Sequence, residues 1–140
     1  KGIVLRVETM MGTKNRVVDA VMPIIMGDSP EYNPLWKNNS IRPSYYPDFF
    51  EVLQRAKEKE GPKIYHVSCS GDALSRLEMA ETILGAYKEK GGQTSIKEFR
   101  SCEAKETKTF ILGTDKTRAE LGVNFIDSRE AIRQHILKDI

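Results

Sequence analysis

The sequence has little cysteine and no excess of one charge. Only two cysteines occur, Cys69 and Cys102, and their spacing excludes both a dense disulfide framework and a cysteine-based zinc site. A single disulfide between them stays open, although the composition favours a reduced, cytoplasmic protein. The 22 basic and 20 acidic residues are mixed along the chain, so no basic stripe predicts binding to nucleic acid or to an anionic membrane. No apolar run reaches the roughly 18 residues of a membrane span.

The sequence also lacks motifs that carry chemistry. No Gly-x-Gly-x-x-Gly or Gly-x-x-Gly-x-x-Gly turn follows a strand to cradle a dinucleotide pyrophosphate. No Tyr-x-x-x-Lys pair supplies a proton donor, and no His-x-x-x-His or acidic cluster indicates a metal. His66 and His135 are typical of structural histidines, and Cys69 is typical of a buried thiol. We therefore predict neither catalytic nor metal-binding residues in this chain, and no oxidoreductase turnover by it alone.

What the sequence does contain is an alternation of strands and helices. Apolar, β-branched or alternating runs predict strands at 3–7, 64–68 and 95–100. Apolar residues at helical spacing predict helices at 15–26, 47–56, 75–87, 115–121 and 128–136. This alternation predicts one α/β domain over residues 1–140.

Several residues are suited to begin or end these helices. Ser75 and Glu78 form a capping-box pattern, because each side chain can satisfy an amide at the helix start. Ser128 is in the position to cap the last helix, and Gly122 to end the helix at 115–121. Pro23 lies inside the first helical pattern and predicts a kink or an early end there.

The chain opens almost directly on a strand. Ile3–Val7 reads as a central strand covered on both faces, yet it follows Lys1 with no lead-in. We expect a preceding domain, with a cleaved leader or an artificial start as the alternative. The apolar edge of this strand then predicts self-association of the 140-residue chain.

Four stretches together resemble one enzyme family. Residues 5–12, L-R-V-E-T-M-M-G, are similar to the V-R-T-S-W-V-Y-G strand and turn of dTDP-4-dehydrorhamnose reductases. Residues 42–49, R-P-S-Y-Y-P-D-F, resemble that family's S-P-T-Y-x-x-D-L segment. Residues 64–80 resemble its Y-H-x-S-G-x-x-x-x-S-x-x-E-x-A block, and residues 112–122 its L-D-x-x-K-x-x-x-L-G ending. Each motif alone is weak, but four in the right order over nearly the whole chain are fairly specific.

The resemblance implies the carboxyl-terminal, substrate-binding half of an extended short-chain dehydrogenase, an α/β fold whose amino-terminal Rossmann half lies upstream of Lys1. That missing half would carry the glycine turn and the Tyr-x-x-x-Lys pair. The cofactor implied is NADP or NAD, contacted beside the nicotinamide by Val7, Glu8 and Thr9. The substrate implied is a nucleotide sugar.

The resemblance also implies that the segment containing Arg42, Pro43 and Tyr45 borders the substrate cleft. The planar guanidinium of Arg42 can pair with two phosphate oxygens, which suits a diphosphate clamp. A surface arginine without a ligand is the open alternative.

Two departures from the family pattern keep a second function open. Thr9 stands where these reductases tend to have a tryptophan, and Glu8 replaces a small polar residue. Residues 33–39 also resemble the regulatory beta subunit of methionine adenosyltransferase, which has the same fold and binds the dinucleotide. The resemblance therefore implies either a nucleotide-sugar reductase or a non-catalytic regulatory subunit with a catalytic protein partner.

Overall fold

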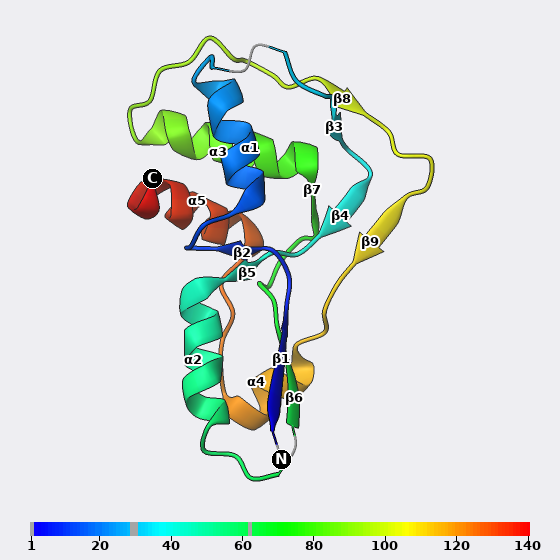
Figure 1. Cartoon of the computed structure of the whole chain (residues 1–140), viewed down its shortest axis with the longest axis vertical. Coiled ribbons are helices and arrows are strands. Elements are labelled where there is room, and N and C mark those ends of the chain that lie inside the picture. The colour runs from blue at the N-terminus through cyan, green and yellow to red at the C-terminus, as the bar shows by residue number, and fades with distance from the viewer. Residues whose placement is uncertain (1, 29–30, 62) are drawn as a thin grey trace.

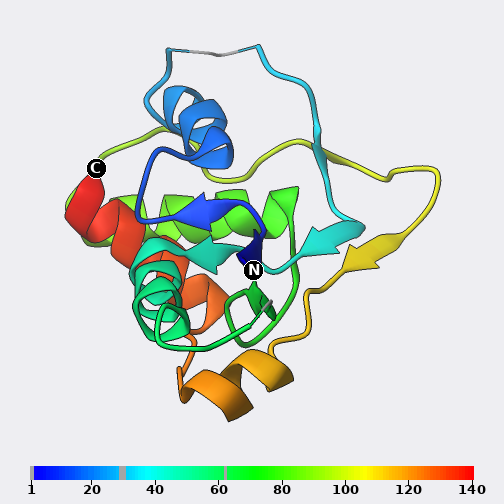
Figure 2. The ribbon, with the colours of Figure 1, turned by 60° about the horizontal axis from the view of Figure 1, so that its bottom comes forward.

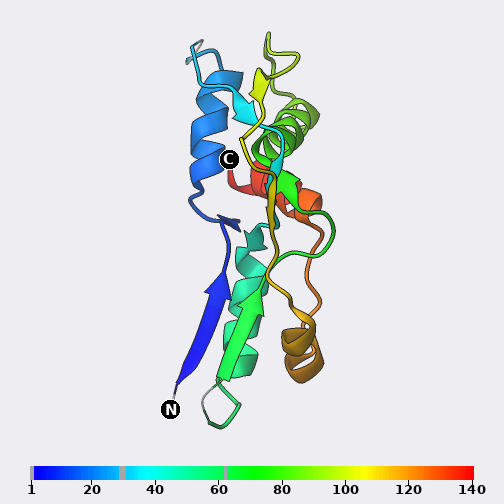
Figure 3. The ribbon, with the colours of Figure 1, turned by 90° about the vertical axis from the view of Figure 1, so that its right-hand side faces the viewer.

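The computed structural model describes residues 2–28, 31–61 and 63–140. The molecule is elongated, with a narrow part that holds two parallel strands and a wider part that holds three helices (Figures 1 and 3). Over these ranges, no helix is both long and apolar enough to span a membrane.

The narrow part is built on two parallel strands, β1 (Ile3–Val7) and β6 (Lys63–Val67), which pair over their whole length. Helices α2 (Tyr46–Ala56) and α4 (Asp115–Leu121) pack against them. Their shared core consists of seven buried residues: Val52, Ala56, Tyr65, Val67, Leu121, Val123 and Phe125.

The expectation that strand 3–7 is covered on both faces is wrong for the described residues. Among these, β1 pairs with β6 alone, and Val4 and Ile64 are 51% and 42% exposed. Leu5 and Tyr65 join the core with α2 and α4, and because side chains alternate along a strand, their neighbours must point the other way. The helices therefore cover one face only, which leaves an apolar face and one edge of β1 open.

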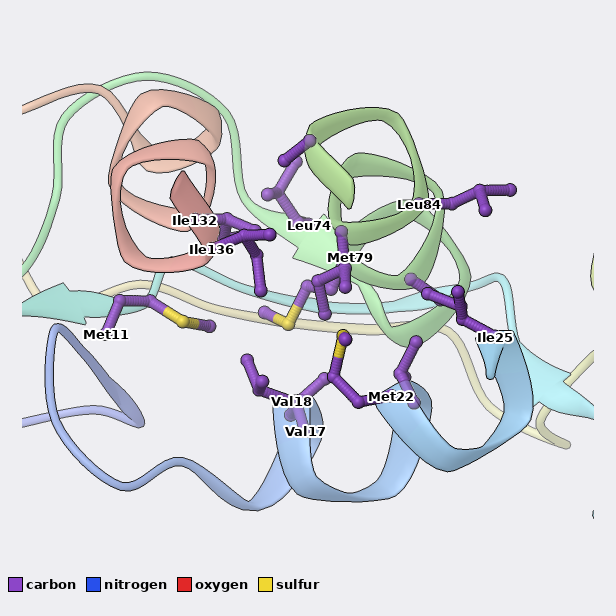
Figure 4. Packing of buried hydrophobic residues seen from close by; sticks show 14 of the residues in the cluster. Met11, Val17, Val18, Met22, Ile25, Leu74, Met79, Leu84, Ile132 and Ile136 are labelled. Carbon is purple, nitrogen blue, oxygen red and sulfur yellow. The ribbon is translucent and has the colours of Figure 1, made fainter. Parts of the chain in front are cut away.

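The wider part packs α1 (Arg16–Ile25), α3 (Arg76–Glu89) and α5 (Ser128–Asp139), with α3 in contact with both other helices. Figure 4 shows side chains of all three helices converging on one core with Met11 and Leu74. Burying a large apolar side chain contributes about 1.5–3 kcal/mol to the free energy of folding, so this cluster stabilises the part of the chain that carries the surrounding loops.

Short strand pairs connect and flank the two parts. The pairs are β2 (Met10–Met11) with β5 (Ser44–Tyr45), β3 (Leu35–Trp36) with β8 (Ser101–Cys102), and β4 (Asn39–Ile41) with both β7 (Leu74–Ser75) and β9 (Lys108–Phe110). Among the strand pairs of the described residues, only the β4–β7 pair is antiparallel. Figure 2 shows β4 and β9 side by side at a distance from α2, on one flank of the molecule.

Most helix ends lie where the sequence predicts them. The capping box is present, since Ser75 Oγ accepts from the Glu78 N–H at 3.1 Å and the Glu78 carboxylate accepts from the Ser75 N–H at 3.0 Å. Gly122 ends α4 in the left-handed conformation, with φ of 69°. Pro23 lies inside α1, which ends two residues later at Ile25.

Two local predictions are wrong. Residues 95–100 form no strand; Phe99 is buried in the helical core, and pairing begins only at β8. The cap of α5 is Asp127, not Ser128, because the Asp127 carboxylate accepts from the N–H groups of residues 129 and 130. Ser128 instead donates to the carbonyl of Asp72 at 2.7 Å. The first error arises from the long-range packing of Phe99, whereas the second is a displacement of the cap by one residue, to a side chain that makes the same kind of local contact.

Candidate functional site

Three segments meet at the carboxyl ends of β1 and β6, and one buried side chain holds them together. Ser44 is fully buried. Its Oγ accepts from the Glu8 N–H at 3.1 Å and donates to the Val67 carbonyl at 2.7 Å, while its own N–H donates to the Thr9 carbonyl at 2.8 Å. The structure thus brings together the predicted cofactor segment 7–9 and the predicted substrate segment 42–45.

The N-terminus of α1 fixes the position of Thr9. Asn15 caps this helix, because its Oδ1 accepts from the N–H groups of Val17 and Val18 at 2.9 and 3.1 Å. Its Nδ2 donates to Thr9 Oγ1 at 3.0 Å and to the Met10 carbonyl at 2.8 Å. One side chain therefore both begins the helix and orients Thr9.

Thr9 lies in the wall of a largely apolar cavity of about 330 Å³. The cavity is formed by the starts of α1 and α3 and by strands on the flank. Three basic side chains, Arg16, Arg76 and Lys108, line it together with two aromatic ones, Trp36 and Phe110. The remaining lining residues are Val17, Asn39, Ser40, Ile41, Leu74 and Met79.

The electrostatics of this cavity favour an anion. Two helices begin there, and the positive ends of their dipoles add to the charge of three basic side chains. Among the ion pairs of the described residues, only Lys108 of the three takes part, with Glu106 at 3.6 Å on the exposed surface. Trp36 and Phe110 are 50% and 54% exposed, so their rings are free to pack against a ligand.

The predicted cofactor residues lie beside this cavity, and some of their backbone polar groups are already hydrogen-bonded within the protein. The Glu8 N–H and the Thr9 carbonyl are bonded to Ser44, and burial raises the pKa of the Glu8 carboxyl above its usual value. Val7 is 38% exposed at the end of β1. These residues offer mainly apolar contact, with one carboxyl that is easier to protonate than usual.

The predicted substrate residues are divided between two places. Arg42 lies in a neighbouring cavity of about 350 Å³ that also includes Ser70 and Arg118. Its Nη2 donates to the Leu112 carbonyl at 3.1 Å, whereas its buried Nε has no hydrogen-bond partner among the described residues.

Pro43 and Tyr45 lie where the 42–45 segment meets the 7–9 segment, and they line neither of these two cavities. Pro43 is buried, and its carbonyl accepts from the Cys69 N–H at 2.8 Å. Tyr45 is half-buried at the start of α2, where burial and then the charge of Asp139 raise the pKa of its hydroxyl.

Sequence reasoning missed five residues that line the first cavity: Arg16, Trp36, Arg76, Lys108 and Phe110. One signal was present. Arg16 and Arg76 are the first residues of their helices, where a cation is unfavourable beside the positive end of the helix dipole. An arginine in that position on two helices indicates that something other than helix stability selects it.

Among the described residues, no group of three or more His, Cys, Asp or Glu side chains is arranged to hold a metal ion. Most titratable side chains near the site serve the fold instead. The thiol of Cys69 is buried, and burial raises its pKa to about 12. His66 lies on β6, where its Nδ1 is 3.0 Å from the Gly113 carbonyl.

No family model and no curated protein sequence matches the chain, whereas solved structures do. dTDP-4-dehydrorhamnose reductase from Bacillus anthracis str. Ames, in complex with NADP, superposes with a TM-score of 0.75 at 14% identity, covering 99% of this chain and 48% of that one. UDP-glucose 4-epimerase from Bifidobacterium longum, in complex with NAD+ and UDP, superposes with a TM-score of 0.68 at 16% identity, covering 96% and 46%.

A dTDP-4-dehydrorhamnose reductase from Clostridium acetobutylicum gives a TM-score of 0.68 at 15% identity, covering 96% of this chain and 47% of that one. The chain spans about half the length of the solved structures that it matches. Its α/β fold is therefore similar to about half of the fold of these reductases and this epimerase, in agreement with the fold that the sequence resemblance implied.

Proposed function

We propose that this chain is the carboxyl-terminal, substrate-binding portion of an NAD(P)-dependent enzyme that acts on nucleotide sugars, a reductase of the dTDP-4-dehydrorhamnose type. The observation that carries the proposal is the 330 Å³ cavity beside Thr9, with its basic and aromatic side chains. The fold supports it, because the similar solved structures include such a reductase with NADP and an epimerase with UDP.

The cavity suits the two chemical parts of a nucleoside diphosphate. The side chains of Arg16 and Arg76 at the starts of two helices and of Lys108 on β9 are suited to phosphate oxygens, since their positive charge attracts an anion and their N–H groups can donate to it. The exposed rings of Trp36 and Phe110 offer flat apolar surfaces for a base or a sugar. In this assignment Arg76 and Lys108 hold the diphosphate and Trp36 stacks on the base.

The predicted substrate residues have supporting roles in this proposal. Arg42 lines the second cavity, where its guanidinium would contribute positive charge toward an anionic part of the ligand. Pro43 and Tyr45 hold the 42–45 segment in place, because the Pro43 carbonyl accepts from the Cys69 N–H and Tyr45 belongs to β5, which pairs with β2.

The residues at the end of β1 fit one wall of a nicotinamide site. Val7 supplies an exposed apolar surface at the open edge of the sheet, and Ser44 fixes the backbone of Glu8 and Thr9. NAD(P), when bound, supplies or accepts the hydride. The described residues include no glycine-rich turn after a strand for its pyrophosphate, so this chain alone fits only the nicotinamide end.

The single tryptophan of the chain makes a direct binding test possible. Fluorescence of Trp36 is recorded during titration with dTDP, UDP and one sugar derivative of each. A saturable change is expected. Arg76→Gln and Lys108→Gln are each expected to weaken binding about tenfold or more, because a hydrogen bond to a charged group contributes about 1.5–3 kcal/mol.

Lys88→Gln is the matched control, because this lysine is in the last turn of α3 and lines no part of the cavity. It is expected to bind like the unchanged chain. The proposal is refuted if no nucleotide binds at millimolar concentration, or if the cavity variants bind as well as the control. Binding by the complete protein without reduction of a 4-keto nucleotide sugar identifies the regulatory subunit instead.

A further inference from the structure

One ring nitrogen of His135 lies between a hydrogen-bond donor and a carboxylate. His135 is on α5 and is only 3% exposed. Its Nδ1 is 2.9 Å from the N–H of Gly12, which donates to it, and 3.2 Å from Oδ2 of Asp139. The described residues thus place both a donor and an acceptor against the same atom.

Nδ1 cannot satisfy both neighbours at once. In the neutral form that carries its hydrogen on Nε2, the lone pair of Nδ1 accepts from the Gly12 N–H, and the Asp139 carboxylate then has no hydrogen on Nδ1 to bond with. In the protonated form Nδ1 carries a hydrogen, which is donated to Asp139, and the Gly12 N–H loses its acceptor. Histidine changes its charge at about pH 5 to 8.

We propose that His135 is a proton-linked latch between α5 and the turn at Gly12. When His135 is neutral, the Gly12 N–H is bonded to the ring and the turn is held against α5. When it is protonated, the ring bonds to Asp139 and the turn is released. This device is separate from the nucleotide site proposed above and does not depend on it.

Asp139 is the charged group in contact with the ring, with its Oδ2 at 3.2 Å from Nδ1. The other titratable groups near the ring or near Asp139 come from the loop, from α1, from β5 and from the ends of α3 and α5: Lys14, Asp19, Tyr45, Lys90 and Lys138.

The turn at Gly12 is tightly packed and lies a few residues before the start of α1. Gly12 has a φ of +89°, and a Cβ there would lie 3.2 Å from Tyr46. Three residues later, Asn15 orients Thr9, and the next residue, Arg16, lines the cavity. The turn at Gly12 is thus close along the chain to Thr9 and Arg16, two residues of the cavity wall.

The test is NMR spectroscopy of the complete 140-residue chain without ligand, labelled with ¹⁵N, between pH 5 and pH 8. The amide signal of Gly12 is expected to titrate with the same midpoint as the ring nitrogens of His135. Amide exchange at Gly12, corrected for the intrinsic pH dependence, is expected to become about five- to thirtyfold faster in the protonated form.

His135→Asn is the decisive variant, because the asparagine Oδ1 replaces Nδ1 as an acceptor and does not titrate. It is expected to keep the Gly12 bond and to abolish the pH dependence of that amide. Asp139→Asn, which retains the histidine, is expected to move the titration to lower pH.

Three results would each overturn the latch. The first is an amide signal of Gly12 that stays constant while the ring of His135 titrates. The second is a ring that remains neutral from pH 5 to pH 8. The third is a His135→Asn variant in which the Gly12 amide signal titrates as before. Because no nucleotide is present, these outcomes are independent of the proposed function.

Discussion

The strongest structural test replaces the hydroxyl that joins the three segments of the site. Ser44→Ala removes one buried hydrogen bond from the Glu8 N–H and one to the Val67 carbonyl, at 3.1 and 2.7 Å. The change is small in volume, so its effect comes from the lost hydrogen bonds and not from a large cavity.

The size of the effect follows from the burial of Ser44. A buried polar group that loses its partner costs about 1–3 kcal/mol, and two bonds are lost, so we expect about 2–6 kcal/mol less free energy of unfolding. With a urea dependence of about 2 kcal/mol per M, the unfolding midpoint falls by about 1–3 M. This is a large fraction of the stability of an ordinary domain.

Urea unfolding followed by circular dichroism measures this change. Ser101→Ala is the matched control, because Ser101 is an exposed residue of β8, and it is expected to change stability by less than about 0.5 kcal/mol. If Ser44→Ala shifts the midpoint no more than the control does, Ser44 does not hold the site together.

Three further outcomes are expected. Because burial raises the pKa of Cys69 to about 12, its thiol stays protonated at pH 8. Iodoacetamide should therefore label the half-buried Cys102 first and should label Cys69 only in urea. Equal labelling of the two cysteines in the folded chain would contradict this. Sedimentation equilibrium should show self-association through the open face and edge of β1, weakened by Val4→Lys; a stable monomer at high concentration would exclude it. The purified 140-residue chain should not oxidise NADPH with a 4-keto nucleotide sugar, and measurable turnover would refute this.

The sequence by itself determined most of the helices. Helix starts depend on contacts within three or four residues, such as the Ser75–Glu78 pair, and such contacts are visible in a linear pattern. Apolar residues at helical spacing likewise identified where these helices lie along the chain. At α5 the same local rule holds but selects Asp127, because Ser128 is engaged by the carbonyl of Asp72 from 56 residues away.

The candidate site was decided mainly by the tertiary structure. Of the six residues that the resemblance implied, only Thr9 lines the 330 Å³ cavity. The residues that give the cavity its positive charge and its aromatic surface are not among these six, and they lie on separate elements, from Arg16 on α1 to Phe110 on β9. Their proximity depends on non-local strand pairing, such as β4 between β7 and β9. No spacing rule along the chain encodes such pairing, because it is the packing of whole elements that brings these side chains to one place.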